Sequence, residues 1–152
     1  MKKLLYICLL LPLVAFQSCK KAHSPGDNYD FSNSLPPYVA FKSTADVKVK
    51  LAADHATAGS ATFAFVMRTG MEQAVTVSYS VSGALTLTGQ TVVIAKETVT
   101  SPNVVINVPA GTAPGTAIIK LDKAVTADGK TLTLGADNNA AKQVANIVIT
   151  QL

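Results

Sequence analysis

The chain has 152 residues, 14% of them charged, and a formal net charge of +4 at pH 7. Its basic residues are spread along the chain and do not form the clustered surface that nucleic-acid binding requires, so we expect no nucleic-acid partner. The length suits one domain, and two cysteines, Cys8 and Cys19, are too few for a disulfide framework.

The first residues have the pattern of a secretory signal peptide. Lys2 and Lys3 give a positive start, and the run 4–16 is uncharged and almost wholly apolar. This run has thirteen residues, fewer than the roughly 20 that a membrane-spanning helix needs. A positive start, a short apolar core and a small exit residue, Ser18, predict a signal peptide over residues 1–18.

The exit of this run, Phe16-Gln17-Ser18-Cys19, resembles the lipobox of bacterial lipoproteins. The resemblance implies that Cys19 receives a diacylglyceryl group through its sulfur and that cleavage falls between Ser18 and Cys19. It also implies acylation of the new amino terminus by a fatty acid such as palmitate. A cysteine suits this chemistry because its thiolate is a strong nucleophile. The alternative is an ordinary cleaved signal that leaves Cys19 as a free thiol.

The segment 19–37 follows as a predicted flexible tether. It contains three prolines and a glycine among Ser and Asn residues, and its polar sequence has no sustained period. Pro36 and Pro37 mark its boundary with a folded domain, which we expect over residues 38–152.

After Pro37 the hydrophobic pattern has period two, which is typical of strands with one buried face. In the run 74–82, for example, Val75, Val77, Tyr79 and Val81 alternate with Ser and Thr residues. The predicted strands are 38–41, 47–51, 60–68, 74–82, 84–88, 91–95, 103–108, 116–121, 131–134 and 144–150. The turn signals between them are Thr69-Gly70, Gly89, Ser101-Pro102, 109–115, Asp128-Gly129 and 135–139.

From these ten short segments we expect a sandwich of about seven to nine strands and no helix, which is an all-β fold, an antiparallel β-sandwich. We expect the strongly alternating strands to be central. The lysines at 48 and 50 fit an edge strand, where charge discourages pairing with other chains.

The order of these strands resembles the Calx-β and immunoglobulin-like domains of Gram-negative envelope lipoproteins, over roughly residues 38–150. The likeness depends on "VTVSYSVSG", on "TVVIAKETVTSPNVVINVP" as a hairpin, on "AIIKLDKAV" and on a closing "ANIVITQL". Calcium-binding members carry acidic residues where this chain has "SGALTLTG" and "PAGTAPGTA". Calcium needs several carboxylate oxygens, so the resemblance implies the fold without the metal.

Few side chains suggest a metal site or a catalytic site. His23 and His55 lie far from other candidate ligands, and Asp54 beside His55 lacks a nucleophile motif, so we expect neither metal nor cofactor nor enzymatic activity. Asp122, Asp128 and Asp137 could bind a cation weakly if one end of a sandwich brought them together. The simpler interpretation assigns them to turns and solubility.

Exposed aromatic rings could bind sugars, although the chain has no Trp. The pattern places Phe41, Phe63, Phe65 and Tyr79 on inward faces. The aromatic residues left for a sugar platform are Tyr29, Phe31 and Tyr38.

The sequence therefore favours a lipid-anchored protein of the cell envelope, most simply at the outer membrane, facing the periplasm or the cell surface. We expect a non-catalytic binding or scaffolding module, with a protein or glycan partner that the sequence does not identify. Two alternatives stay open: a structural or adhesive subunit of a surface polymer, and an accessory glycan-binding lipoprotein of a polysaccharide-uptake system.

Overall fold

The computed structural model describes residues 36–52 and 57–152. These residues belong to one compact unit, Pro36–Leu152. Within these residues, none of the helical segments has the length and apolarity to cross a membrane. The ten strands of this part are β1 (Tyr38–Phe41), β2 (Val47–Leu51), β3 (Gly59–Phe63), β4 (Phe65–Met67), β5 (Val75–Gly83), β6 (Leu87–Ile94), β7 (Val104–Val108), β8 (Gly115–Thr126), β9 (Thr133–Leu134) and β10 (Val144–Gln151). Two 3-10 turns, η2 (Ala136–Asn138) and η3 (Ala140–Lys142), connect β9 to β10.

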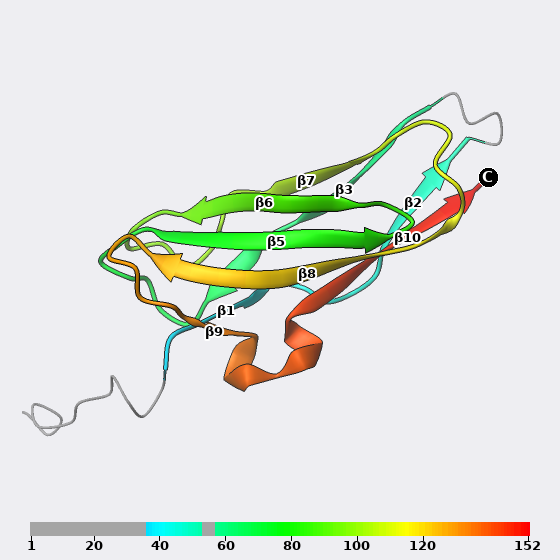
Figure 1. Cartoon of the computed structure of the whole chain (residues 1–152). Coiled ribbons are helices and arrows are strands. Elements are labelled where there is room, and N and C mark those ends of the chain that lie inside the picture. Colours follow the sequence, from blue (N-terminus) through cyan, green and yellow to red (C-terminus); the bar gives the residue numbers. More distant parts are fainter. Residues whose placement is uncertain (1–35, 53–56) are drawn as a thin grey trace, which may run out of the picture. The chain divides into compact units, whose positions relative to one another are not determined.

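The strands form two layers around one core (Figure 1). One layer is a five-stranded sheet in the order β2-β10-β8-β5-β6. The other combines a three-stranded sheet, β4-β1-β9, with the pair β3-β7. This confirms the predicted all-β fold, an immunoglobulin-like sandwich. It also confirms that β2, which carries Lys48 and Lys50, is an edge strand.

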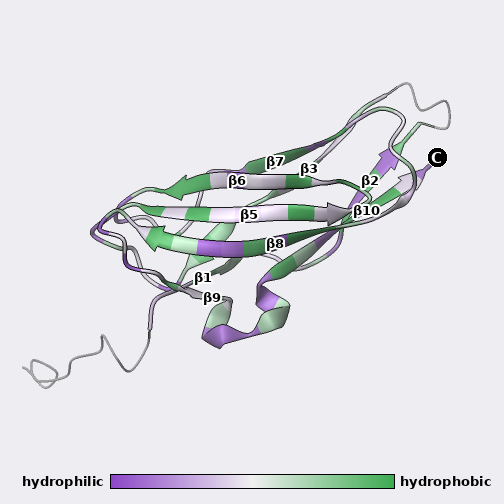
Figure 2. Cartoon of the chain, in the orientation of Figure 1, coloured by the Kyte–Doolittle hydropathy of each residue, from purple (hydrophilic) through white to green (hydrophobic). Residues whose placement is uncertain are grey.

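Alternating residues of both layers build the core, as the period of two requires. Along β5 the buried residues are Val75, Val77, Tyr79 and Val81, and Figure 2 shows this alternation as bands along the strand. The four predicted inward aromatics are all at most 6% exposed. Phe41 meets Phe63 and Phe65 edge-on, and Phe65 lies against Tyr79 with 5.6 Å between ring centroids, so these rings join the two layers.

Two pairings are parallel, which differs from the wholly antiparallel sandwich that we predicted. β10 runs parallel to β2 from the Ile147–Val47 pair to the Gln151–Leu51 pair, and β1 runs parallel to β9. The predicted hairpin over 91–109 is also wrong, because β6 and β7 belong to different layers. Hydrophobic alternation identifies a strand and its buried face, but it carries no information on the direction of the neighbour.

Gly89 lies inside a strand and not in a turn, so the predicted strands 84–88 and 91–95 are one strand, β6. Between the pairs Tyr79–Gln90 and Val81–Leu87, β5 contributes one residue and β6 contributes two. Gly89 is in the left-handed region at φ 64°. This is a β-bulge, a position where glycine meets the same backbone requirement as in a turn.

The predicted strand 60–68 is divided at Ala64 into β3 and β4. Ser101-Pro102-Asn103 stands opposite Ala64-Phe65, between the pairs Phe63–Val104 and Val66–Thr100, so the segment before β7 has one extra residue. Pro102 has no N–H to offer the ladder. At this irregularity the Ser101 hydroxyl takes the place of a backbone carbonyl: it accepts the Phe65 N–H at 2.9 Å and donates to the Pro102 carbonyl at 2.8 Å.

Candidate functional site

Three neighbouring strands place Arg68, Tyr38 and Thr133 in one row. Tyr38 pairs with Thr133 across the parallel β1–β9 contact. Val39 pairs with Met67 on the other side, so Arg68, the next residue after β4, follows in register opposite Tyr38. Val39 and Met67 point into the core, and successive strand residues face opposite ways. The row therefore lies on the outer face of the three-stranded sheet.

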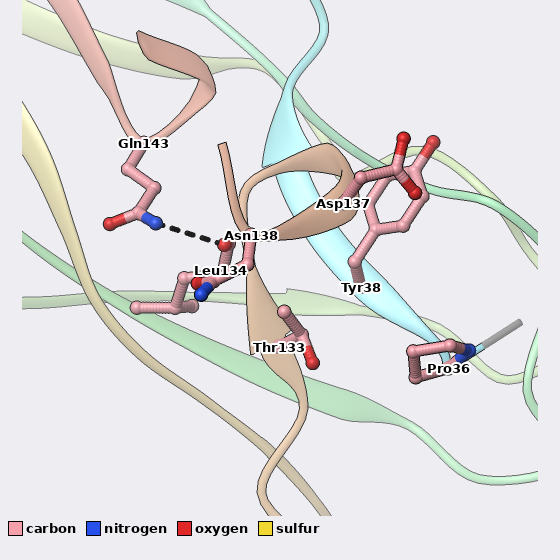
Figure 3. A pocket seen from close by; sticks show the side chains of 7 residues that line it. All are labelled: Pro36, Tyr38, Thr133, Leu134, Asp137, Asn138 and Gln143. Atoms are coloured by element: carbon pink, nitrogen blue, oxygen red, sulfur yellow. Dashed lines mark hydrogen bonds between the residues drawn. The ribbon is translucent and has the colours of Figure 1, made fainter. Parts of the chain in front are cut away.

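A tightly folded loop after β9 closes one side of this row. Gly135 ends β9 with φ 74° and donates its N–H to the Val39 carbonyl at 2.7 Å. Asp137 and Asn138 follow with φ values of 53° and 57°, in the left-handed region that Asp and Asn tolerate better than most residues. Gln143 Nε2 donates to the Leu134 carbonyl at 3.1 Å and ties the end of the loop to β9 (Figure 3).

Arg68 connects the sheet to the loop. Its Nη2 donates to Asp137 Oδ1 at 3.1 Å, and its guanidinium carbon lies 5.3 Å from the centroid of the Tyr38 ring. The ion pair is open to water, since the Asp137 side chain is 81% exposed, so it stabilises the fold by well under about 1 kcal/mol. Its effect is to hold the Arg68 guanidinium and the Asp137 carboxylate beside the Tyr38 ring.

The row and the loop border an open hollow of about 600 Å³, which we call the Tyr38 hollow. It is lined by Pro36, Tyr38, Thr133, Leu134, Asp137, Asn138 and Gln143 (Figure 3). Its volume falls within the range of about 300–1,000 Å³ that is typical of small-molecule sites. Most of its lining groups are neutral hydrogen-bonding groups, so the hollow is suited to binding.

Asp122, Asp128 and Asp137 do not come together, because each has a different partner. Asp122 is the extra residue of a bulge in β8 and accepts the Ser80 hydroxyl at 3.0 Å. Asp137 pairs with Arg68. Across residues 36–52 and 57–152 there is also no group of three His, Cys, Asp or Glu residues arranged to hold a metal ion.

Asp128 belongs to the turn after β8. The Thr126 hydroxyl donates to its Oδ1, and its own N–H donates to Gln73 Oε1 at 2.9 Å. The Thr126 hydrogen bond is the main reason why the pKa of Asp128 lies below its usual value of 3.8. Asp128 thus serves a turn, as the simpler interpretation of the sequence holds.

Of the other predicted positions, Tyr38 is half-buried and lines the hollow. The positions outside the described residues are Ser18, Cys19, His23, Tyr29, Phe31, Asp54 and His55.

Sequence reasoning did not single out Arg68, Thr133, Asn138 and Gln143. Arg68 is the sole arginine of the chain, and the run Asp137-Asn138-Asn139 begins two residues after Gly135, which is a signal for left-handed backbone. Both features can be read from the sequence. The parallel β1–β9 contact that brings them together leaves no trace in the local sequence.

No family model and no curated protein matches this chain. Among solved structures, it is similar to a two-domain protein of unknown function from Bacteroides fragilis, with a TM-score of 0.53 and 7% identity. The match covers 79% of this chain and 47% of that protein, so the chain spans about half of its length. At this identity the likeness supports the fold alone.

A second solved structure is the CARDB domain of a Pyrococcus furiosus protein in complex with di-metal ions. It matches with 14% identity over 78% of this chain and 87% of that domain. The TM-score of 0.34 is too low for an argument about this chain.

Proposed function

We propose that this chain is a lipid-anchored protein of the bacterial envelope whose sandwich serves as a non-catalytic binding module. The observation that carries the binding role is the Tyr38 hollow, which residues 36–38 and the stretch 133–143 build on the outer face of the three-stranded sheet. Its described lining residues include neither histidine nor cysteine. The side chains that most often transfer protons or attack substrates near neutral pH are therefore missing from that lining.

The anchor is proposed from Phe16-Gln17-Ser18-Cys19, with Cys19 as the lipidated residue and the outer membrane as the destination. Each buried methylene group adds about 0.8 kcal/mol, and a single chain holds a protein only reversibly, so stable anchoring requires the two or three chains of a processed lipoprotein. The finer likeness to Calx-β domains is part of this proposal, and it depends on the strand sequences quoted above.

Metabolic labelling with an alkyne analogue of palmitate tests the anchor. We expect the wild-type chain to be labelled and Cys19→Ser to be unlabelled and released from the membrane fraction. Cys8→Ser is the matched control and should be labelled normally, because the cleavage removes it. Equal labelling of the wild type and Cys19→Ser would contradict the anchor.

A further inference from the structure

We propose that the Tyr38 hollow binds a neutral, hydroxyl-rich ligand of the saccharide class. This inference rests on the proposed function, since it names the ligand of the binding module. It follows from the charge, the hydrogen-bonding groups and the rigidity of the hollow.

The hollow has no net charge. Asp137 is the charged residue of its described lining, and the Arg68 guanidinium lies 3.1 Å from its Oδ1 and neutralises it. An anionic ligand such as phosphate therefore finds no net positive charge to balance its own, and a cationic ligand would have to compete with Arg68 for Asp137. A neutral ligand meets neither penalty.

The lining offers both donors and acceptors, as a ligand rich in hydroxyl groups requires. Gln143 donates to Leu134 through Nε2, which leaves its Oε1 as an acceptor. Thr133 has a hydroxyl group, and Asn138 adds an amide that can both donate and accept. Asp137 Oδ2 is a further acceptor, since Arg68 engages Oδ1. A sugar hydroxyl donates one hydrogen bond and accepts others, so it can use either kind of group.

Tyr38 adds an apolar surface beside these polar groups. Its ring is half-buried, with the Arg68 guanidinium 5.3 Å from its centroid. Within the described part of the chain its hydroxyl has no hydrogen-bond partner, so it can meet a ligand. A sugar ring combines an apolar C–H face with polar edges, and an aromatic ring next to amide and hydroxyl groups matches both.

The groups are held in place before a ligand arrives. Tyr38 and Thr133 lie on paired strands, and the loop is fixed at both ends, by the Gly135 N–H on Val39 and by Gln143 on Leu134. Asp137 and Asn138 keep backbone conformations that most residues avoid, and such conformations cluster at ligand sites. Pre-organised groups lose little entropy on binding.

The test uses the chain without its signal peptide, with Cys19→Ser so that it is soluble without lipid. It is screened on an array of neutral and acidic oligosaccharides, and hits are titrated calorimetrically up to about 10 mM, where even weak specific sites are detected. Inorganic phosphate and citrate are titrated in parallel. We expect at least one neutral oligosaccharide to bind and the two anions not to bind.

Three substitutions then locate the site. We expect Tyr38→Ala and Asn138→Gly each to weaken binding at least about tenfold, since each removes a direct contact. Glycine keeps the left-handed backbone at 138. Thr133→Val should weaken binding about five- to tenfold by loss of one hydrogen bond, whereas Thr91→Val, the same change on exposed β6, should have no effect.

Circular dichroism and thermal melts of each variant separate loss of contact from loss of fold. The inference would be overturned by any one of three results. These are that no neutral oligosaccharide binds, that phosphate or citrate binds more tightly than the oligosaccharides, or that the Thr133→Val and Thr91→Val variants bind equally well. None of these results bears on palmitate labelling at Cys19, so the anchor and the ligand class fail independently.

Discussion

Ser101 supplies the acceptor for a buried backbone N–H where the strand pairing between β4 and the segment before β7 becomes irregular. Its side chain is 6% exposed and serves two backbone groups, the Phe65 N–H and the Pro102 carbonyl. A buried N–H without a partner is costly, which explains why a polar residue occupies this buried position.

Ser101→Ala should destabilise the fold by about 1–3 kcal/mol, because the Phe65 N–H loses its acceptor in a buried position. Urea unfolding followed by circular dichroism measures this change. Ser43→Ala is the control: Ser43 also accepts a backbone N–H, from Ala45 at 3.2 Å, but in an exposed place, so its effect should stay within about 0.5 kcal/mol. Similar losses in the two variants would show that burial at 101 does not matter.

Asp128 should give the fold a dependence on acidic pH. Folding lowers the pKa of this carboxyl, chiefly through the Thr126 hydroxyl, so its ionised form stabilises the folded state above the unfolded pKa of about 3.8. That contribution is lost as the pH falls through the folded pKa.

We therefore expect Asp128→Asn to be less stable than the wild type at pH 7, and the difference to shrink below about pH 4. Thermal melts between pH 2.5 and about 7 would measure it. The same comparison in a Thr126→Val background is the control, since it removes the hydroxyl that lowers the pKa. A difference that is constant with pH would be incompatible with this role.

At the scale of elements, the alternation of apolar residues predicted the strands well and the interruptions poorly. Val75, Val77, Tyr79 and Val81 are buried as expected, because burial follows the two-residue period of a strand. The sequence predicts turns at Gly89 and Ser101-Pro102, and both lie at bulges. Turns and bulges demand the same residues, since both need unusual backbone angles or lack a ladder hydrogen bond.

The Tyr38 hollow was less predictable than the strands. Tyr38 was noted as an exposed aromatic and Asp137 as a turn carboxylate, each for a local reason. Their proximity depends on the parallel pairing of β1 with β9 and on the Arg68 ion pair across 69 residues of sequence. Such long-range pairing is decided by the packing of the whole sandwich.

The loop of η2 and η3 depends on Gly135. A Cβ at this position would lie 2.4 Å from the Asn139 carbonyl oxygen, and the backbone has φ 74°. Gly111 has a similar φ of 80° but open space around it, so Gly111→Ala carries the backbone cost alone, about 1–2 kcal/mol. We expect Gly135→Ala to cost about 1–3 kcal/mol more, because it adds the clash.

Thermal melts of these two variants measure the difference. Gly135→Ala should also displace the Asp137 and Asn138 signals in a two-dimensional NMR spectrum, whereas Gly111→Ala should leave them in place. Equal stabilities and unchanged spectra would mean that the loop tolerates a side chain at 135.

At the scale of the whole molecule, three outer strands, β2, β6 and β7, have features that discourage pairing with other chains. β2 carries Lys48 and Lys50, β6 has its Gly89 bulge, and β7 lies between Pro102 and Pro109. Charged side chains, bulges and proline are the usual features that prevent an edge strand from pairing with another chain. This argues for a monomer and against the polymer-subunit alternative.

We expect the soluble Cys19→Ser chain to elute as a monomer in size-exclusion chromatography with light scattering. The double variant Lys48→Val/Lys50→Val should self-associate, because it exposes an uncharged edge. Lys120→Val/Lys123→Val removes the same charge from β8, which is flanked by β10 and β5, and should stay monomeric. An oligomeric parent chain would restore the polymer alternative.

The position of β10 determines when β2 can join the five-stranded sheet. β10 (Val144–Gln151) lies between β2 and β8, so β2 gains its ladder only when β10 is in place. During synthesis β2 therefore has no partner strand until β10 has been made. Deleting β10 would leave β2 without its partner strand, and a nascent chain stays open to proteases and chaperones until β10 has emerged.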